Sequence, residues 1–334
     1  MVFILVIVAL LVLLFLIWYM FSYLSLHRKL PAECALREWQ TQARKRLGVD
    51  VDMNLVERDC ITVDGGCLYV DVLSVEQGGP TVVFMPGTAA YAELYIEFIF
   101  ALHSKGFNVV GFDPRGHGRS CGPRGDFTIQ EMVDDAIEVA RYAKRRFGGK
   151  VGISGSSQGG VVSFYVAATG EVISAAMCHN FAVLDGKDNV QLSNFRPPQW
   201  AMPFILALFY RLPFLVLPVT FYISFPYTLR DGTPALKFLK KDPGAVVAYS
   251  LRAMSTLGKT PMAVPVEQIK TPIMLIGAKG DKVFPPAFVE RIFERLTCKK
   301  RYVNFDLDTH LILVNYVKEV IEPIAQWFDE TLRH

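Results

Sequence analysis

The chain has 334 residues, enough for two ordinary domains or for one large α/β domain with an insertion. Hydrophobic residues make up 51% of it, slightly above the norm for soluble proteins, and the excess is local. The formal net charge is only +3, so the composition gives no reason to expect a nucleic-acid partner.

The cysteines show no C-x-x-C pair and no His/Cys spacing that suits zinc, so the sequence predicts no metal site. An even number of cysteines permits disulfides, but a chain of this length does not need them. We therefore expect reduced thiols, several of them buried in strands. The six cysteines are Cys34, Cys60, Cys67, Cys121, Cys178 and Cys298.

The chain begins with an uncharged apolar run over residues 2–21, which continues to a basic cluster at 27–29. Twenty helical residues rise about 30 Å, the thickness of a bilayer's hydrocarbon core. A cleaved signal peptide is the alternative, but the run exceeds the roughly 7–15 apolar residues of a signal peptide and has no basic region before it. No small-x-small cleavage site precedes Pro31. We expect an uncleaved transmembrane anchor over residues 1–29.

Basic residues follow the apolar run closely, and none precedes it. The positive-inside rule therefore places the rest of the chain in the cytoplasm, and unpaired cysteines would agree with that placement. The sequence thus predicts a single-pass membrane protein in contact with the lipid bilayer. The basic residues are Arg28, Lys29, Arg37, Arg44, Lys45 and Arg46.

After a helical, charged linker at residues 30–55, short β-rich runs alternate with helical patterns. Continuous apolar runs such as 81–85 and 108–112 suit strands that are buried on both faces. The alternation predicts a mostly parallel sheet with helices on both faces, built from residues 56–183 and 270–334. The other expected strands are 60–63, 67–75, 151–154, 173–178, 273–276 and 302–305, and the expected helices are 91–104, 128–147, 158–169 and 313–333.

Residues 184–269 break this alternation and show no strand pattern. Within them, the segment 200–227 is apolar and aromatic, but four prolines and Arg211 interrupt it. A second transmembrane helix is the alternative, and the prolines and the arginine count against it. We expect a helical cap over the sheet, apolar where it meets a substrate or the membrane.

Residues 155–159 read G-S-S-Q-G, directly after an apolar run and before a stretch of small residues with helical character. Strand, G-x-S-x-G and helix in this order are typical of a nucleophile elbow. The turn is so tight that Ser157 takes strained backbone angles, so Gly155 and Gly159 must flank it almost without side chains. A Gly/Ser-rich turn without a chemical role is the alternative for this motif alone.

A serine nucleophile needs a base that takes its proton and a third group that holds the base. After a nucleophile elbow, these partners follow in the order Asp or Glu, then His. Asp281 stands just past a predicted strand, and His310 lies in the loop after the next strand. A solvated turn residue and a helix cap are the respective alternatives. Among the six histidines, only His310 combines a loop after a strand with a position beyond both partners.

Four motifs occur in order: V-V-F-M-P-G-T at residues 82–88, G-F-D-P-R-G-H-G-R-S at 111–120, the elbow at 155–159, and the segments that carry Asp281 and His310. In this order they resemble the α/β-hydrolase superfamily, and most closely its monoacylglycerol lipase and lysophospholipase-like branch of serine hydrolases. The resemblance covers the predicted core, cap excluded. It implies the α/β-hydrolase fold with a cap insertion and chemistry without a cofactor or metal.

The resemblance also implies an oxyanion hole formed by the backbone N–H groups of Thr88 and Gln158. The family commonly has His-Gly in the first of these loops, whereas this chain has Pro-Gly, so Ala89 is an alternative to Thr88. The D-P-R-G-H-G turn at residues 113–118 is structural in the resembling family. In some enzymes of this fold the catalytic acid follows the strand expected here at residues 173–178. Asp185, which comes a short loop after that strand, is therefore the alternative to Asp281.

We expect a membrane-anchored serine hydrolase that cleaves carboxylic esters of fatty acyl chains through an acyl-enzyme on Ser157. In this hypothesis His310 moves the proton and Asp281 orients the imidazole. The sequence does not distinguish among lysophospholipid, monoacylglycerol and acyl thioester as the substrate. An acyltransferase or thioesterase with the same triad, or a binding protein without catalysis, are the alternatives. The sequence does not determine the oligomeric state.

Overall fold

The computed structural model describes residues 2–180, 183–184 and 198–333. At its centre lies an eight-stranded sheet in the order β1-β2-β4-β3-β5-β6-β9-β10. β2 pairs antiparallel with β1 and β4, and the other neighbouring strands pair parallel, as the sequence predicts. The strands are β1 (Glu57–Val63), β2 (Gly66–Leu73), β3 (Thr81–Met85), β4 (Asn108–Phe112), β5 (Val151–Ser156), β6 (Ala175–His179), β9 (Ile273–Ala278) and β10 (Lys300–Phe305).

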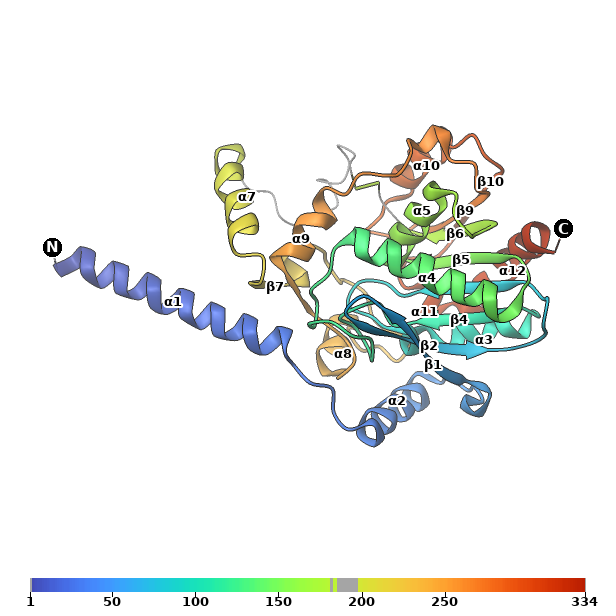
Figure 1. Cartoon of the computed structure of the whole chain (residues 1–334), viewed down its shortest axis with the longest axis horizontal. Helices are drawn as coiled ribbons and strands as arrows, with labels where there is room; N and C mark the ends of the chain where they lie inside the picture. The colour runs from blue at the N-terminus through green and yellow to red at the C-terminus, as the bar shows by residue number, and fades with distance from the viewer. Residues whose placement is uncertain (1, 181–182, 185–197, 334) are drawn as a thin grey trace.

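Helices cover both faces of the sheet (Figure 1). β3 is buried along its whole length, and its consecutive side chains point to opposite faces. Val83 and Met85 join the apolar core under α4, α5 and α10, whereas Val82 and Phe84 join the core under α3 and α12. Each large apolar side chain buried in this way contributes about 1.5–3 kcal/mol. These helices are α3 (Ile96–Ser104), α4 (Ile129–Phe147), α5 (Gln158–Thr169), α10 (Pro286–Arg295) and α12 (Val317–Leu332), and the short α11 (Ile312–Asn315) precedes α12.

Residues 198–269 form an insertion between β6 and β9, where the cap is expected. The expectation of helices alone needs a correction, because β7 (Val216–Pro218) and β8 (Ala248–Ser250) pair as an antiparallel ribbon. Each strand has three residues, too few to produce the alternation by which a strand is recognised. The helices of the insertion are α7 (Met202–Arg211), α8 (Ala235–Lys241) and α9 (Leu251–Gly258).

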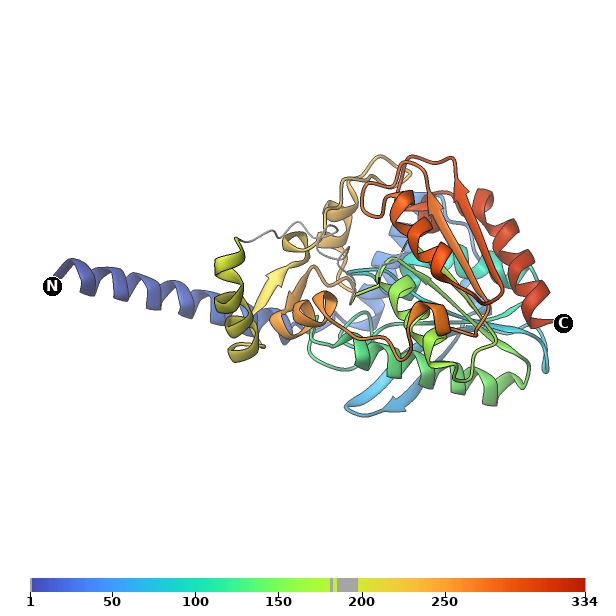
Figure 2. The ribbon, with the colours of Figure 1, turned by 90° about the horizontal axis from the view of Figure 1, so that it is seen from above.

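Helix α1 (Val2–Leu26) projects from the body of the molecule, and its residues 3–17 are exposed (Figures 1 and 2). Among the described helices, Phe3–Leu26 alone is long and apolar enough to cross a membrane by length and composition. Both an anchor and a signal sequence have these properties. Helix α7 has 10 residues and rises about 15 Å, half of a bilayer core, so it does not support a second span.

The C-terminal part of α1 docks on the insertion. The indole Nε1 of Trp18 donates to the carbonyl of Val216 at 2.8 Å, and the amide of Val216 donates to Ser22 Oγ at 3.0 Å. The ring of Tyr19 meets Phe214 edge-on, with centroids 5.7 Å apart. Helix α1 is therefore attached to β7 by specific contacts. Helix α2 (Glu33–Leu47) follows within the predicted linker.

A disulfide joins Cys60 on β1 to Cys67 on β2, so the expectation of reduced thiols is wrong for this pair. The two cysteines lie 7 residues apart on a hairpin, and their Cα atoms are 5.7 Å apart, within the range a disulfide spans. A chain of this length does not need a disulfide for stability, but the hairpin turn brings these two positions together. The cysteines that remain free are Cys34, Cys121, Cys178 and Cys298.

Candidate active site

Ser157 stands in a tight turn between the end of β5 and the start of α5, with φ 54° and ψ −116°. This left-handed backbone is strained for a residue with a side chain. A Cβ on Gly155 would lie 2.1 Å from the carbonyl oxygen of Gly159, and a Cβ on Gly159 would lie 2.2 Å from that of Met85. Neither position has room for a side chain. The sequence G-x-S-x-G is thus explained by the close approach of three backbone segments.

Asp281 follows β9, and His310 lies in the loop between β10 and α11. The parallel strands bring these loops to one edge of the sheet, where His310 Nδ1 and Asp281 Oδ2 are 2.7 Å apart. The other carboxylate oxygen, Oδ1, accepts from the amides of Val283 at 2.7 Å and Phe284 at 3.0 Å. It also accepts from the hydroxyl of Tyr227 at 3.3 Å. Asp281 is therefore held on both sides by donors.

Asp281 is only 4% exposed. Burial by itself would raise the pKa of its carboxyl, but neighbouring His310 and the amides of Phe284 and Val283 outweigh burial and hold this pKa below its ordinary value. The carboxylate therefore stays ionised at neutral pH and accepts the Nδ1 proton of His310. The Nε2 atom of His310 is then the imidazole nitrogen that can take a proton from a nearby hydroxyl.

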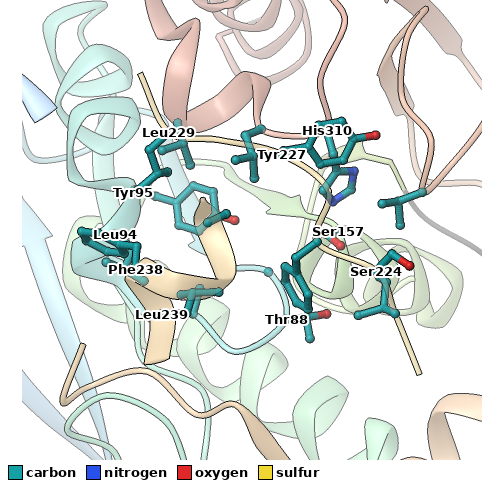
Figure 3. Close-up of a pocket in the computed structure, with 18 of the residues that line it drawn as sticks. Thr88, Leu94, Tyr95, Ser157, Ser224, Tyr227, Leu229, Phe238, Leu239 and His310 are labelled. Carbon is teal, nitrogen blue, oxygen red and sulfur yellow. The ribbon is translucent and has the colours of Figure 1, made fainter. Parts of the chain in front are cut away.

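Ser157 and His310 line the same pocket (Figure 3). The sheet side contributes Thr88 and Tyr95, and the insertion contributes most of the apolar wall. Among the described residues, no Asp or Glu lines this pocket. The space beside Ser157 therefore suits an uncharged, apolar group. The apolar lining includes Leu47, Leu94, Ile223, Phe225, Leu229, Phe238, Leu239, Val283 and Val314.

Thr88 lies in the loop after β3, and Gln158 is the first residue of α5. The amide of Ala89 donates to the hydroxyl of Tyr249 at 2.8 Å, so this N–H is already bound and Thr88 is the better candidate for an oxyanion donor. The first N–H groups of a helix have no partner within the helix, which leaves the Gln158 amide available for an oxyanion. Thr88 Oγ1 also donates to Gln158 Oε1 at 3.2 Å, which ties the two loops together.

Tyr249 connects the D-P-R-G-H-G turn to this loop. The Nε2 atom of buried His117 lies 3.0 Å from the Tyr249 hydroxyl, and burial lowers the pKa of His117 to about 3, so the ring is neutral. Both carboxylate oxygens of Asp113 accept backbone amides, from Ala92 at 2.9 Å and Arg119 at 2.8 Å. The turn therefore positions Tyr249, whose hydroxyl binds the loop that carries Thr88. Neither Asp113 nor His117 lines the pocket.

Sequence analysis missed Tyr227, Tyr249 and Asn180, which contact the predicted site residues. The two tyrosines belong to the insertion, where no local pattern marks them, and Asn180 follows β6 as a single polar residue. The alternative acid Asp185 lies outside the described residues. Within the described ranges, no group of three or more His, Cys, Asp or Glu side chains is arranged to hold a metal ion.

The sheet order, the helices on both faces and the elbow define an α/β hydrolase. Residues 79–315 match the family described as "Serine aminopeptidase, S33" (Hydrolase_4), and this match spans well over half of the chain. The chain belongs to this family of α/β hydrolases.

Two solved lipase structures share the fold. The monoacylglycerol lipase of Paleococcus ferrophilus is 23% identical with a TM-score of 0.62, and the match covers 79% of this chain and 99% of that one. A soluble variant of the monoglyceride lipase of Saccharomyces cerevisiae, in complex with a substrate analogue, is 14% identical with a TM-score of 0.64, covering 85% and 98%. The chain is thus similar in fold to lipases of the esterase kind.

The "Uncharacterized protein YqkD" of Bacillus subtilis (strain 168) is 25% identical over 222 residues. The match covers 64% of this chain and 59% of that protein, so the chain spans less than two thirds of the relative's length.

Proposed function

We propose that this protein is a serine hydrolase that cleaves carboxylic esters of fatty acyl chains. The observation that carries the proposal is one apolar pocket lined by Ser157, on a nucleophile elbow, and by His310, which is paired with Asp281. An ester with a long acyl chain offers an uncharged carbonyl for the serine and an apolar tail for the wall. Monoacylglycerol and lysophospholipid are the substrate classes we propose to test first.

In the proposed reaction, Ser157 Oγ attacks the ester carbonyl while its proton passes to His310 Nε2. The amides of Thr88 and Gln158 stabilise the oxyanion, with about 3–4 kcal/mol per donor at stake. His310 then returns the proton to the leaving alcohol, and the acyl group remains on Ser157. Water, deprotonated by His310, releases the fatty acid and restores the serine. Asp281 holds the imidazole in the required tautomer throughout.

The family description names an aminopeptidase, whose substrate presents a charged α-amino group. A charge of that kind needs a carboxylate partner when it is buried. The described residues that line the pocket include no Asp or Glu, which favours an uncharged ester over a peptide N-terminus.

We also propose that residues 1–29 are a retained anchor, followed by a linker at 30–55, with the cap at 184–269. The contacts of Trp18 and Ser22 with Val216 support retention, because cleavage would remove them. The basic flank favours a cytoplasmic body. The Cys60–Cys67 disulfide removes the support that unpaired cysteines offered to this placement, since disulfides are typical of oxidising compartments. Protease added to intact cells should leave a cytoplasmic body uncut, and a digested body would place it outside.

A fluorophosphonate probe tests the function directly, because it reacts with an activated serine. Wild type should be labelled, and Ser157→Ala should not be. Ser224→Ala is the matched control, since Ser224 lines the same pocket and should not affect labelling. A panel of lipid esters of varied chain length then defines the substrate, and products formed with added alcohols separate hydrolysis from acyl transfer. A folded wild type that neither reacts nor hydrolyses any ester would refute the proposal.

A further inference from the structure

A chain of buried hydrogen bonds leads from the pocket wall into the interior beside the elbow. The hydroxyl of Tyr95 donates to Ser156 Oγ at 3.3 Å, and Ser156 Oγ lies 3.0 Å from His179 Nδ1. Asn180 Nδ2 lies 2.8 Å from His179 Nε2. Burial lowers the pKa of His179 to about 3, so this imidazole is neutral, with one donor and one acceptor nitrogen. Because an amide NH₂ can only donate, His179 accepts at Nε2 and donates from Nδ1 to Ser156.

The chain ends at the Asp281–His310 pair. Asn180 Nδ2 donates to Asp281 Oδ2, the same oxygen that accepts from His310, and it lies 3.4 Å from His310 Nδ1. The opposite amide orientation would place the oxygen of Asn180 against the carboxylate, so the assignment of Nδ2 follows from charge. Asn180 thus contacts both groups on which the proposed chemistry depends.

The backbone holds Asn180 in this place. The residue directly follows β6, is fully buried, and has a φ of 45°, which asparagine tolerates better than most residues. Its amide donates to the carbonyl of Ile276 on β9 at 3.1 Å, while the preceding carbonyl, that of His179, accepts from Ser157 at 2.8 Å. The position is therefore fixed between the serine elbow and the strand that leads to Asp281.

We propose that Asn180 is a positioning residue for the Asp281–His310 pair. The proposal rests on the hydrolase function proposed above. Asn180 does not line the pocket, so it acts on the reaction through Asp281 and His310 rather than through substrate.

The first test is Asn180→Leu in the full-length protein, which removes the amide donor and keeps the size of the side chain. We expect kcat on a short soluble ester to fall about tenfold or more, as when a hydrogen bond to a charged group is lost. KM should not change, because the residue lies outside the pocket. Asn304→Leu is the matched control at the same end of the sheet, opposite Gly277 on β9, and should keep the kcat of wild type. A folded Asn180→Leu protein with wild-type kcat would overturn the proposal.

The second test combines Asn180→Leu with Asp281→Asn. Asp281→Asn alone should lower kcat about 10⁴-fold, and adding Asn180→Leu should lower it little further, because Asn180 acts through the same Asp281–His310 pair. A purely structural role for Asn180 predicts that the two losses multiply, and a folded double variant with multiplied losses would refute the positioning role. If thermal melting shows that Asn180→Leu does not fold, Asn180→Ala takes its place in both tests. An inactive, unlabelled wild type would refute the hydrolase function itself, whereas an active wild type with unresponsive Asn180 variants would refute only the role of Asn180.

Discussion

At the scale of single residues, the carboxylate of Asp281 is the most informative group. Its Oδ2 accepts from His310 and Asn180, and its Oδ1 accepts from the amides of Val283 and Phe284. These donors satisfy a carboxylate that is almost fully buried. Their arrangement leaves one tautomer of the imidazole, which is the one that a serine nucleophile requires.

We predict that Asp281→Asn lowers turnover of a soluble ester about 10⁴-fold, because an amide no longer selects the required tautomer of His310. Asp306→Asn is the matched control, since Asp306 follows the neighbouring strand β10 and its side chain is 87% exposed. Asp185→Asn should also leave most activity intact. Steady-state kinetics on the three variants checks the assignment, and the reverse ranking of Asp185 and Asp281 would move the acid.

A second residue, Asp71, makes the stability of the folded chain depend on pH. Burial and the nearby carboxylate of Asp113 raise the pKa of Asp71 to about 7, although the guanidinium groups of Arg58 and Arg119 act in the opposite direction. The folded chain therefore keeps this proton up to about pH 7, whereas the unfolded chain loses it near pH 4. Folding binds a proton between these values, so the stability that Asp71 contributes is present below about pH 4 and is lost as the pH rises to 7.

Asp71→Asn has no proton to lose, so its melting temperature should fall less than that of wild type between pH 5 and pH 7.5. Melting of the detergent-solubilised protein at several pH values measures this slope. Asp64→Asn, in the exposed hairpin turn, should melt with the slope of wild type. An Asp71→Asn slope equal to that of wild type would show that Asp71 is ionised in the folded state.

At the scale of elements, the C-terminal part of α1 packs on the ribbon β7–β8. Besides the contacts of Trp18 and Ser22 with Val216, the carbonyl of Leu26 accepts from the amide of Arg124 at 2.7 Å. Arg28 donates to the carbonyl of Ala245 at 2.6 Å. The end of α1 thus satisfies backbone groups of the insertion and of the body.

A chain that begins at Trp18 should therefore melt near the temperature of the full chain, while one that begins at Pro31 should melt several degrees lower. The shorter chain loses the hydrogen bonds to Val216 and the buried side chain of Leu26, which uncovers Val216 and Ala248. Both should hydrolyse a short soluble ester, because Ser157, Asp281 and His310 lie beyond either start. Thermal melts and ester assays compare the two chains, and equal melting temperatures would contradict the docking role.

Helix α7 and the turn before it present a second exposed apolar surface. Trp200, Phe204 and Tyr210 are 75%, 73% and 84% exposed, and α7 runs crosswise to α1 in both views (Figures 1 and 2). Aromatic residues of this kind favour the interface between lipid and water. If α1 crosses a bilayer, this face of α7 is therefore suited to lie along the bilayer surface.

We predict that Phe204→Ser with Tyr210→Ser weakens the binding of the chain that begins at Trp18 to lipid vesicles. Activity on a soluble ester should not change, because neither residue lines the pocket. Leu55→Ser is the control, since Leu55 is also an exposed apolar residue but precedes β1, far along the chain from α7. Co-sedimentation with vesicles measures the effect, and equal loss in the control would indicate a general loss of hydrophobicity.

At the scale of the whole molecule, the segment on which α1 docks leads to the pocket. The segment after β7 continues directly to Ile223 and Phe225, which line the pocket beside Ser157. The element that α1 holds is therefore close in the chain to a wall of the pocket. This arrangement is suited to a substrate that enters from a lipid surface.

The full chain should remain in the membrane pellet after high-salt and carbonate washes if α1 spans the bilayer. The chain that begins at Trp18 should lose this insertion and lose more activity on vesicle-borne lipid than on a soluble ester, because the anchor concentrates the enzyme at its substrate. Paired assays on both substrates measure the difference. Equal activity of the two chains on both substrates would refute the delivery role, and a processed N-terminus in the native protein would show a signal peptide.

The sequence alone determined the features that depend on local patterns. Alternating strands and helices predicted the mostly parallel sheet, because apolar periodicity reflects burial on each face. The elbow at residues 155–159 was predictable because close backbone approach leaves room only for glycine at two positions. The pairing of Asp281 with His310 was predictable because an acid and then a histidine follow a nucleophile elbow in this order, each in the loop after a strand.

Only the tertiary structure decided what depends on contacts between distant segments. Tyr249 from the insertion occupies the Ala89 amide and so favours Thr88, and Trp18 finds its partner in β7, 198 residues further along the chain. Asn180 belongs to no recognisable sequence motif. Its contact with Asp281 is seen only in the structure, where β6 ends beside that residue. No local pattern encodes such contacts, because they arise when the packing of the whole chain brings unrelated segments into reach.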